Sequence, residues 1–262
     1  MLNLSELTDK VRALAIEAGD FIREERKKFH REAIEKKHAH DYVSYVDKES
    51  EKKIVTRLKE LLPEAGFIAE EGSGTLNDEQ YCWLVDPLDG TTNFIHDNAP
   101  YCVSIALRSK KELLLGVVYE ICRNECFWTY KGAPSYLNGN EIHVSAISNL
   151  DDSFIALGFP YATEEYKPMV NHLVNTLYGN VAGLRLMGAA AVELCYIAAG
   201  RFEARIEAFI GPWDIAAGTI ILQNAGGMIT DFKGGDSYSS GSQVLATNGR
   251  IHRDLLNIID NL

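Results

Sequence analysis

The segment from Trp83 to Asn93, WLVDPLDGTTN, places two carboxylates directly after an apolar run. The run is typical of a buried strand, where unpaired charge is costly. Because Pro87 cannot continue a central ladder, we expect the chain to leave the sheet directly after Asp86. Asp89 and Gly90 then supply a turn that can fold Asp89 back beside Asp86. The segment therefore requires a fold in which cations or protons offset two adjacent carboxylates.

Four acidic residues share this kind of position, at the end of a predicted strand or the start of a predicted helix. They are Glu70, Asp86, Asp89 and Asp214. The carboxyl edge of a sheet is where α/β folds gather their functional groups. Carboxylates brought together repel one another unless protons or cations intervene, and an oxygen-rich cluster suits Mg²⁺. The pattern predicts a magnesium site, where two ions about 4 Å apart would assist phosphoryl transfer.

The GTTN part of the segment adds features of a phosphate site. Gly90 lets the backbone approach closely, and the N–H groups of Gly90, Thr91 and Thr92 could accept an anion at a helix start. The Thr91 hydroxyl could orient a water molecule. Asp-Pro and Asp-Gly are also ordinary turn dipeptides, and Asp214 could be an ordinary N-cap. The whole string D-P-x-D-G-T-x-N is far more specific than its parts, and neither a P-loop nor a GxGxxG string is present.

Composition narrows the class of protein. The 262 residues are 46% hydrophobic, enough for one sizeable core or two tightly joined subdomains. A net charge of −11 argues against nucleic-acid binding as the main function, although a local basic patch is compatible with it. Charges within the N-terminal apolar pattern argue against a signal peptide, and no uncharged run reaches membrane-span length. The five cysteines form no CxxC pair, which favours reduced thiols in a cytoplasmic protein.

The order of predicted elements indicates a layered α/β protein. Helical periodicity covers 4–28 and 46–66, with a polar loop or hairpin between them. Short strand-like runs follow, and those in 101–130 favour an antiparallel meander. From 153 onward strands and helices alternate. We place a seam near 148–152, so that residues 1–150 and 151–262 form two parts of one compact catalytic unit.

Two segments carry a family resemblance. WLVDPLDGTTNF and PWDIAAGTIILQNAGG resemble the two signatures of the inositol monophosphatase family, Mg²⁺-dependent and lithium-sensitive phosphomonoesterases, most of all its bacterial members. FIAEEGS, DYVSYVDKESE, TYKGAPSYLNGNEIHVS and RLMGAAAVELCYIAAGRFEARIE also fit, so the match covers nearly the whole chain. The resemblance implies a layered αβαβα sandwich that is usually dimeric.

The resemblance also assigns roles to individual residues. It implies metal ligation by the side chains of Glu70, Asp86, Asp89 and Asp214 and by the Leu88 carbonyl, with Asp47 as a further ligand of a weaker third ion. Glu70 and Thr91 would position the attacking, metal-activated water. The groups expected around the phosphate and the polyol are Gly90, Thr91, Asn93, Gly188, Ala189, Ala190, Glu207 and the loop residue Lys36. Ala189 stands where relatives commonly have serine or threonine, so the polyol contacts differ.

The implied reaction is hydrolysis of a small polyol or sugar phosphate, with myo-inositol 1-phosphate as the best guess and two or three Mg²⁺ ions. The same chemistry could act on fructose 1,6-bisphosphate, 3′-phosphoadenosine 5′-phosphate or histidinol phosphate. A regulatory role with a macromolecular partner is an alternative of another class. We expect a homodimer with no membrane partner, and nucleic acid is not an expected partner.

Other polar and aromatic residues favour simpler interpretations. His38 and His40 could chelate zinc, but a solvated loop is the better interpretation. Residues 23–38 are rich in basic residues but also contain four glutamates, which favours a solvated helix face. We expect Trp213 to pack and fix Asp214 rather than to form a substrate platform, and we assign no role to Tyr161.

Overall fold

The structure is a computed structural model that describes residues 2–30, 32, 34–38, 41–74, 79–110, 112–161 and 163–260. Two long helices open the chain: α1 (Leu4–Arg26) and α2 (Tyr45–Leu61). α1 begins at Asn3, whose side chain accepts a hydrogen bond from the Glu6 N–H. Between the helices, β1 (Ile34–His38) and β2 (Asp41–Ser44) pair as an antiparallel hairpin, which is one of the two conformations predicted there.

A seven-stranded sheet follows in the order β3-β4-β5-β6-β7-β8-β9. Its strands are β3 (Ala65–Ala69), β4 (Tyr81–Asp89), β5 (Cys102–Ser109), β6 (Leu113–Glu120), β7 (Glu125–Tyr130), β8 (Ser135–Leu137) and β9 (Asn140–Ile142). The short helix α3 (Thr91–Ile95) joins β4 to β5. β3 and β4 are parallel, and every later pair is antiparallel, which confirms the predicted meander.

The second half of the chain forms a five-stranded sheet in the order β11-β10-β12-β14-β13. The strands are β10 (Phe154–Leu157), β11 (Gly183–Arg185), β12 (Ala204–Ala208), β13 (Met228–Thr230) and β14 (Gln243–Thr247). The helices are α4 (Thr163–Leu177), α5 (Ala190–Ala198), α6 (Pro212–Asn224) and α7 (His252–Ile259), with the short 3₁₀ helix η2 (Ser237–Ser240). This alternation of strands and helices is the predicted one.

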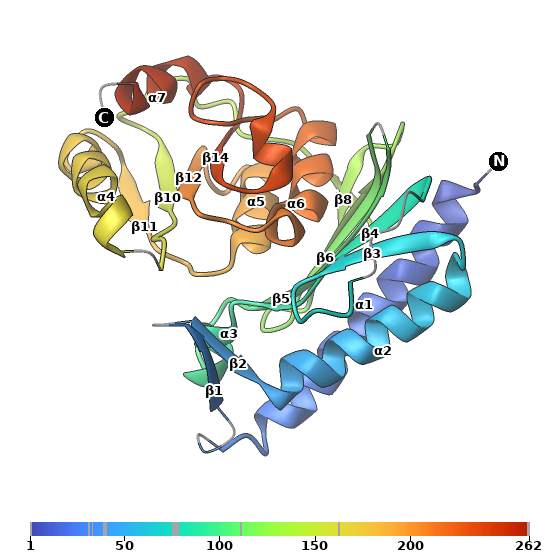
Figure 1. The fold of residues 1–262 in the computed structure, drawn as a ribbon. Coiled ribbons are helices and arrows are strands. Elements are labelled where there is room, and N and C mark those ends of the chain that lie inside the picture. Colours follow the sequence, from blue (N-terminus) through green and yellow to red (C-terminus); the bar gives the residue numbers. More distant parts are fainter. Residues whose placement is uncertain are drawn as a thin grey trace.

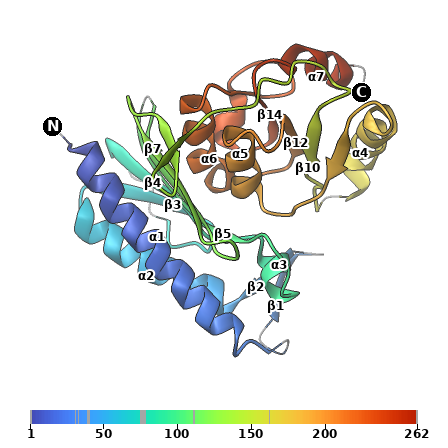
Figure 2. The ribbon, with the colours of Figure 1, turned by 180° about the vertical axis from the view of Figure 1, so that it is seen from behind.

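The elements stack in five layers, as Figure 1 shows and Figure 2 confirms from behind. α1 and α2 cover one face of the seven-stranded sheet, and α5 and α6 cover the other. The five-stranded sheet lies beyond α5 and α6, and α4 and α7 close its outer face. The αβαβα sandwich is therefore confirmed. Nothing among the described helices combines the length and apolarity that a bilayer crossing needs.

The path of the chain after Asp86 differs from the prediction. β4 does not end at Asp86: it continues to Asp89, where it pairs again with Cys102 of β5. The register shifts between Asp86 and Asp89, so Pro87 occupies a bulge. Pro87 is tolerated because β3 pairs with β4 only as far as Val85, which leaves no ladder partner on that side. The bulge therefore lies between Asp86 and Asp89, and both residues are at the carboxyl end of β4.

The division into residues 1–150 and 151–262 coincides with the division between the two large sheets. The first sheet ends at Ile142 and the second begins at Phe154. The cores are not separate, however. α5 and α6 of the second half pack directly on Leu84, Ala106 and Val118 of the first. The molecule therefore has a shared apolar layer in its centre.

Candidate active site

A cavity of about 470 Å³ opens where the carboxyl end of β4 meets the start of α6. Its inner wall contains all four acidic residues that the sequence singled out: Glu70, Asp86, Asp89 and Asp214. Glu70 follows β3, Asp86 and Asp89 flank the bulge in β4, and Asp214 is in the first turn of α6. The structure thus brings together side chains separated by up to 144 positions in sequence, from Glu70 to Asp214.

Backbone N–H groups hold the three aspartates in place. Asp86 Oδ1 accepts from the Leu88 N–H at 2.9 Å, and Asp214 Oδ2 accepts from the Gly211 N–H at 2.8 Å. Asp89 accepts from two successive N–H groups at the start of α5, at 3.1 and 2.7 Å, which come from Ala190 and Ala191. The sequence analysis did not predict that the start of α5 orients a carboxylate of the site.

Burial and neighbouring carboxylates disfavour ionisation of the three aspartates. Burial raises the pKa of Asp86 well above its usual range, and the charges of Glu70, Asp89 and Asp214 raise it further. Burial, with the charges of Glu70 and Asp89, raises the pKa of Asp214 to about 8. Burial raises the pKa of Asp89 to about 6, and the rise is limited because its backbone N–H partners and Arg205 favour the ionised form. A divalent cation would relieve this repulsion.

The donor set fits Mg²⁺ in kind, since it consists of carboxylates next to a backbone carbonyl. Leu88 lies on the wall of the cavity, and the Thr91 Oγ1 is 3.0 Å from its carbonyl oxygen. Within the described part of the chain, no three His, Cys, Asp or Glu side chains already have the spacing of a metal cage. The present contacts aim the aspartate oxygens at backbone donors, so ion binding would have to draw the side chains together.

Asp47 lies beneath the cavity rather than on its wall. It is fully buried at the start of α2, where Oδ2 accepts from the N–H and the hydroxyl of Ser44, at 2.8 and 2.7 Å. Its Oδ1 lies 2.8 Å from the Thr91 hydroxyl. In this geometry Asp47 positions Thr91, and both of its oxygens are occupied. Thr91 itself lines the cavity.

The expected phosphate and polyol residues also surround this cavity, namely Gly90, Thr91, Asn93, Gly188, Ala189, Ala190 and Glu207. Gly90 adopts φ +90°, and a Cβ there would lie 2.9 Å from the Pro100 carbonyl oxygen, so the bend requires glycine. The Asn93 amide nitrogen bonds the carbonyls of Pro100 and Met187, both at 2.7 Å, and so ties two walls together. Lys36 belongs to β1, but its side chain lies outside the described part, as do those of His38 and His40.

A buried ion network behind the polyol wall was not predicted. Glu193 Oε2 accepts from Arg205 Nε at 2.5 Å, and Arg205 Nη2 contacts Glu207 Oε2. Glu193 Oε1 accepts from the N–H groups of Met187 and Gly188, at 3.1 and 3.2 Å. Two signals were present in the sequence. Glu193 is the single charge in an otherwise apolar helix, and Arg205 and Glu207 share one face of a strand whose other face is apolar.

The mouth of the cavity is aromatic. Phe159, Tyr161 and Phe209 line it, and each side chain is about half exposed, at 46%, 49% and 58%. Trp213, which we expected to pack and fix Asp214, lines the wall beside them. Tyr161, to which no role was assigned, is part of this rim. Single aromatic residues in predicted loops carry no sequence signal for such a rim.

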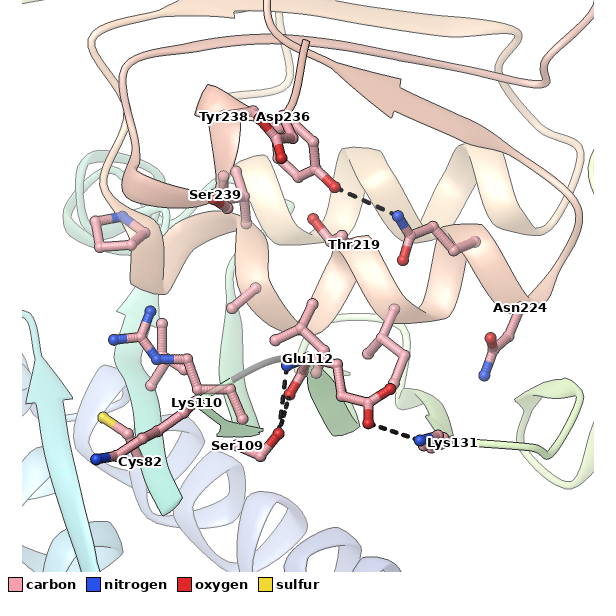
Figure 3. Close-up of a pocket in the computed structure, with 18 of the residues that line it drawn as sticks. Cys82, Ser109, Lys110, Glu112, Lys131, Thr219, Asn224, Asp236, Tyr238 and Ser239 are labelled. Atoms are coloured by element: carbon pink, nitrogen blue, oxygen red, sulfur yellow. Dashed lines mark hydrogen bonds and ion pairs between the residues drawn. The ribbon is translucent and has the colours of Figure 1, made fainter. Parts of the chain in front are cut away.

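A second cavity of about 850 Å³ lies on the other side of α6 (Figure 3). Thr219, Asn224 and Tyr238 lie along its helical wall, opposite Ser109 and Glu112 at the end of the sheet. The lining contains three basic residues, Arg108, Lys110 and Lys131, and three acidic ones, Glu79, Glu112 and Asp236. Charge therefore favours no particular occupant, and the cavity lacks the carboxylate cluster of the first.

Comparison with known proteins settles the family. The family described as "Inositol monophosphatase family" matches residues 3–261, almost the entire chain. The chain belongs to the inositol monophosphatase family. The resemblance inferred from the two signature segments is thereby confirmed.

Among its relatives, Nus factor SuhB of Pasteurella multocida is 39% identical over 225 residues, which cover 85% of this chain and 84% of the relative. The crystal structure of extragenic suppressor protein suhB from Bartonella henselae superposes with a TM-score of 0.90 at 32% identity, covering 98% of each chain. The inositol monophosphatase from Anabaena gives a TM-score of 0.89 at 31% identity, covering 100% of this chain and 98% of the other. Family membership implies a small phosphate ester as substrate and, in general, dependence on Mg²⁺.

Proposed function

We propose that this protein is a Mg²⁺-dependent phosphomonoesterase that acts on a small polyol phosphate, with myo-inositol 1-phosphate as the preferred candidate. One observation carries the proposal: four acidic side chains line the inner end of the cavity beside the Gly90–Thr91 bend, where burial and the neighbouring carboxylates disfavour ionisation of Asp86 and Asp214. Such a set is suited to a divalent cation and a phosphate. The side chains that would hold Mg²⁺ are Glu70, Asp86, Asp89 and Asp214, with the Leu88 carbonyl.

Bound Mg²⁺ would supply positive charge where the phosphoryl oxygens accumulate negative charge. The remaining steps belong to the chain itself. The Thr91 hydroxyl, held by Asp47 at 2.8 Å, can accept a hydrogen bond from a water in the cavity and orient it toward phosphorus. Glu70 lies on the same wall and would accept a proton from that water. The tight bend at Gly90 lets the backbone approach the phosphate.

The proposal predicts Mg²⁺-dependent release of phosphate from myo-inositol 1-phosphate. Asp89→Asn and Asp214→Asn should each lower the rate by about 100-fold or more, because a ligand charge is lost. Far-UV circular dichroism should show that both variants keep the fold. Asp152→Asn, a substitution at an exposed residue outside the cavity lining, is the matched control and should keep full activity. Undiminished turnover in both site variants would refute the metal assignment.

The substrate preference is tested by comparing kcat/KM for other phosphomonoesters with that for myo-inositol 1-phosphate. A panel containing fructose 1,6-bisphosphate, 3′-phosphoadenosine 5′-phosphate and histidinol phosphate should give lower kcat/KM values than myo-inositol 1-phosphate. The motivating feature is Glu207, which lines the cavity and can accept hydrogen bonds from hydroxyls. A clear preference for the nucleotide would replace our substrate assignment.

A second candidate function is regulatory binding to a macromolecular partner. It is favoured by the name of the Pasteurella multocida relative, a Nus factor. That name leaves our expectation against a nucleic-acid partner without support. If this function is present, a catalytically inactive Asp214→Asn protein should still capture such a partner from lysate. Binding would then be independent of catalysis. Size-exclusion chromatography with light scattering tests the proposed homodimer in the same preparation.

A further inference from the structure

The polyol side of the cavity contains a buried arginine with a free edge. Arg205 is only 2% exposed, yet it lines the cavity. Its Nε and Nη2 are paired with Glu193 and Glu207. Its Nη1 is buried and, among the residues that the structure describes, has no hydrogen-bond partner. A buried unpaired donor is costly, and one on the wall of a substrate cavity indicates an acceptor atom on the ligand.

The charges around Arg205 restrict the kind of acceptor. The guanidinium carries one positive charge, but it lies between the carboxylates of Glu193 and Glu207, so the group of three has a net charge of −1 when all are ionised. A second phosphate or carboxylate on the substrate would meet this surplus of negative charge. A hydroxyl would not, because it can accept from Arg205 Nη1 and donate to Glu207 at no cost in charge.

We propose that Arg205 is a specificity-determining residue that, together with Glu207, binds neighbouring hydroxyls of the leaving alcohol and selects against substrates with a second anionic group. The inference rests on the proposed phosphatase function and specifies its substrate class. Arg205 donates from Nη1 to one hydroxyl oxygen, and Glu207 accepts from the adjacent hydroxyl. The pair therefore recognises a vicinal diol as a donor–acceptor unit.

Two further contacts keep this pair in place. Glu193 anchors the guanidinium at one end and the 187–188 backbone at the other, which links Arg205 to the wall next to Asn93. Gly158 faces Glu207 so closely that a Cβ would lie 2.0 Å from the carboxyl carbon. The Glu207 carboxylate is therefore confined between Arg205 and the Gly158 backbone. Any side chain at position 158 would displace it.

Two matched pairs of substrates test the inference. myo-Inositol 1-phosphate and cyclohexyl phosphate share a six-membered ring and differ in the hydroxyls. Glycerol 3-phosphate carries two neighbouring hydroxyls, and 3-phosphoglycerate has a carboxylate in place of the hydroxymethyl group. The wild-type protein should give a kcat/KM at least about 10- to 100-fold higher for the member of each pair that carries neighbouring hydroxyls, the size expected for a hydrogen bond to a charged group.

Three variants separate recognition from structure. Arg205→Met combined with Glu193→Gln avoids leaving the Glu193 carboxylate buried without its partner, and it should remove most of the preference for myo-inositol 1-phosphate over cyclohexyl phosphate. Gly158→Ala should reduce the same preference by displacing Glu207 while Arg205 stays. Arg201→Met is the matched control: Arg201 forms a bidentate pair with Glu125 at 2.6 and 2.7 Å, and neither residue lines the cavity. This control should keep the wild-type preference.

The outcomes that contradict the inference are distinct from failure of the proposed function. A wild-type preference for 3-phosphoglycerate over glycerol 3-phosphate that disappears in the double variant would show that Arg205 binds an oxyanion instead. Equal loss on all four esters would reduce Arg205 to a structural residue. If the wild-type protein hydrolyses none of them, the proposed function fails. In that case, ligand-observed NMR of free myo-inositol tests the inference independently of catalysis. Binding to the wild-type protein that the double variant loses supports the inference, and absence of binding to the wild-type protein overturns it.

Discussion

Asp214 is a residue whose proposed role as a metal ligand lowers the conformational stability of the metal-free protein. Its carboxylate lies near Glu70 and Asp89, and without a cation their charges destabilise its ionised form. We expect Asp214→Asn to stabilise the metal-free protein by about 1 kcal/mol, because folding no longer requires this carboxylate either to take up a proton or to bear a disfavoured charge. The bond from the Gly211 N–H is retained, since the asparagine carbonyl can accept it.

Thermal unfolding with EDTA and with Mg²⁺ measures this effect. The wild-type midpoint should rise on adding Mg²⁺, whereas the Asp214→Asn midpoint should start higher and rise less. Asp152→Asn should behave like the wild type. An identical Mg²⁺ response in the wild type and in Asp214→Asn would mean that this carboxylate does not meet the ion.

His252 is held in one neutral tautomer by two threonines. Thr230 donates its hydroxyl hydrogen to the Asp231 carbonyl at 2.8 Å, so its oxygen must accept from Nε2–H of His252 at 2.9 Å. Thr247 Oγ1 accepts from the Gly249 N–H and lies 3.0 Å from Nδ1, to which it donates. Protonation of Nδ1 would require the Thr247 hydroxyl to turn its hydrogen away and to lose its role as donor to the ring. Burial accordingly lowers the pKa of His252.

This arrangement predicts a loss of stability in mild acid. Because the folded-state pKa is depressed, the contribution of His252 is fully present above its unfolded pKa of about 6.5 and is lost as the pH falls through the folded value. The thermal midpoint should fall by about 2–4 °C for each kcal/mol lost. His252→Gln should weaken this dependence between pH 7.5 and 5. A midpoint equally sensitive to pH in the variant would assign the effect to other groups.

For single residues, the sequence allowed correct predictions where a reactive side chain lies next to a recognisable turn. The four acidic residues of the cavity and Thr91 were found because strand ends and helix starts bracket them. Arg205 and Glu193 were not found, because a charge inside an apolar strand or helix does not reveal its partner. Their pairing depends on how α5 crosses β12, which only the three-dimensional structure gives.

Among the elements, α6 has the most demanding position, because it carries Asp214 and packs on the seven-stranded sheet. Gly116 of β6 permits this packing: a Cβ there would lie 2.6 Å from both the Ala217 carbonyl oxygen and Ile220 Cγ2. Gly116→Ala should therefore push α6 away from the sheet and destabilise the protein by about 1–3 kcal/mol. Because Asp214 moves with the helix, the Mg²⁺ concentration needed for half-maximal activity should also rise.

Val117→Ala provides the control for this prediction. Val117 is buried on the opposite face of β6, on the side of α1, so its truncation should lower stability without displacing α6. Chemical unfolding and Mg²⁺ titrations of activity should be compared in the two variants. If both variants lose stability but neither changes the Mg²⁺ requirement, the position of α6 does not control the site.

The helices and strands themselves were largely predictable from apolar periodicity, and their ends were less so. Pro87 was expected to end β4, but the strand resumes after a bulge because β3 offers no partner beyond Val85. That outcome depends on strand order, which local sequence does not encode. The family resemblance implies Asp47 as a ligand of a third ion; in the structure Asp47 lies in α2, and its carboxylate contacts Ser44 at the N-cap of that helix and Thr91 of α3.

At the scale of the whole molecule, the two sheets share one central layer. Leu84 and Val118 of the first sheet, α5 and α6, and Val244 of the second sheet belong to the same buried cluster. Separating the halves would expose this apolar surface to water. We therefore expect one cooperative unfolding transition, although the order of elements along the chain suggests two parts.

Two probes can test this cooperativity. Tryptophan fluorescence reports on Trp83 and Trp128 in the first half and Trp213 in the second, and far-UV circular dichroism reports on all helices. Their denaturant transitions should coincide. Two separated transitions would show instead that residues 1–150 and 151–262 unfold independently.

The most direct test of the central claim is anomalous X-ray diffraction from crystals soaked in Mn²⁺ as a substitute for Mg²⁺. We predict at least one strong peak in the cavity, within about 2–2.5 Å of carboxylate oxygens from at least two of Glu70, Asp86, Asp89 and Asp214. An empty cavity at saturating Mn²⁺, or peaks confined to other surfaces, would contradict the assignment of these four residues to a metal-dependent phosphatase site.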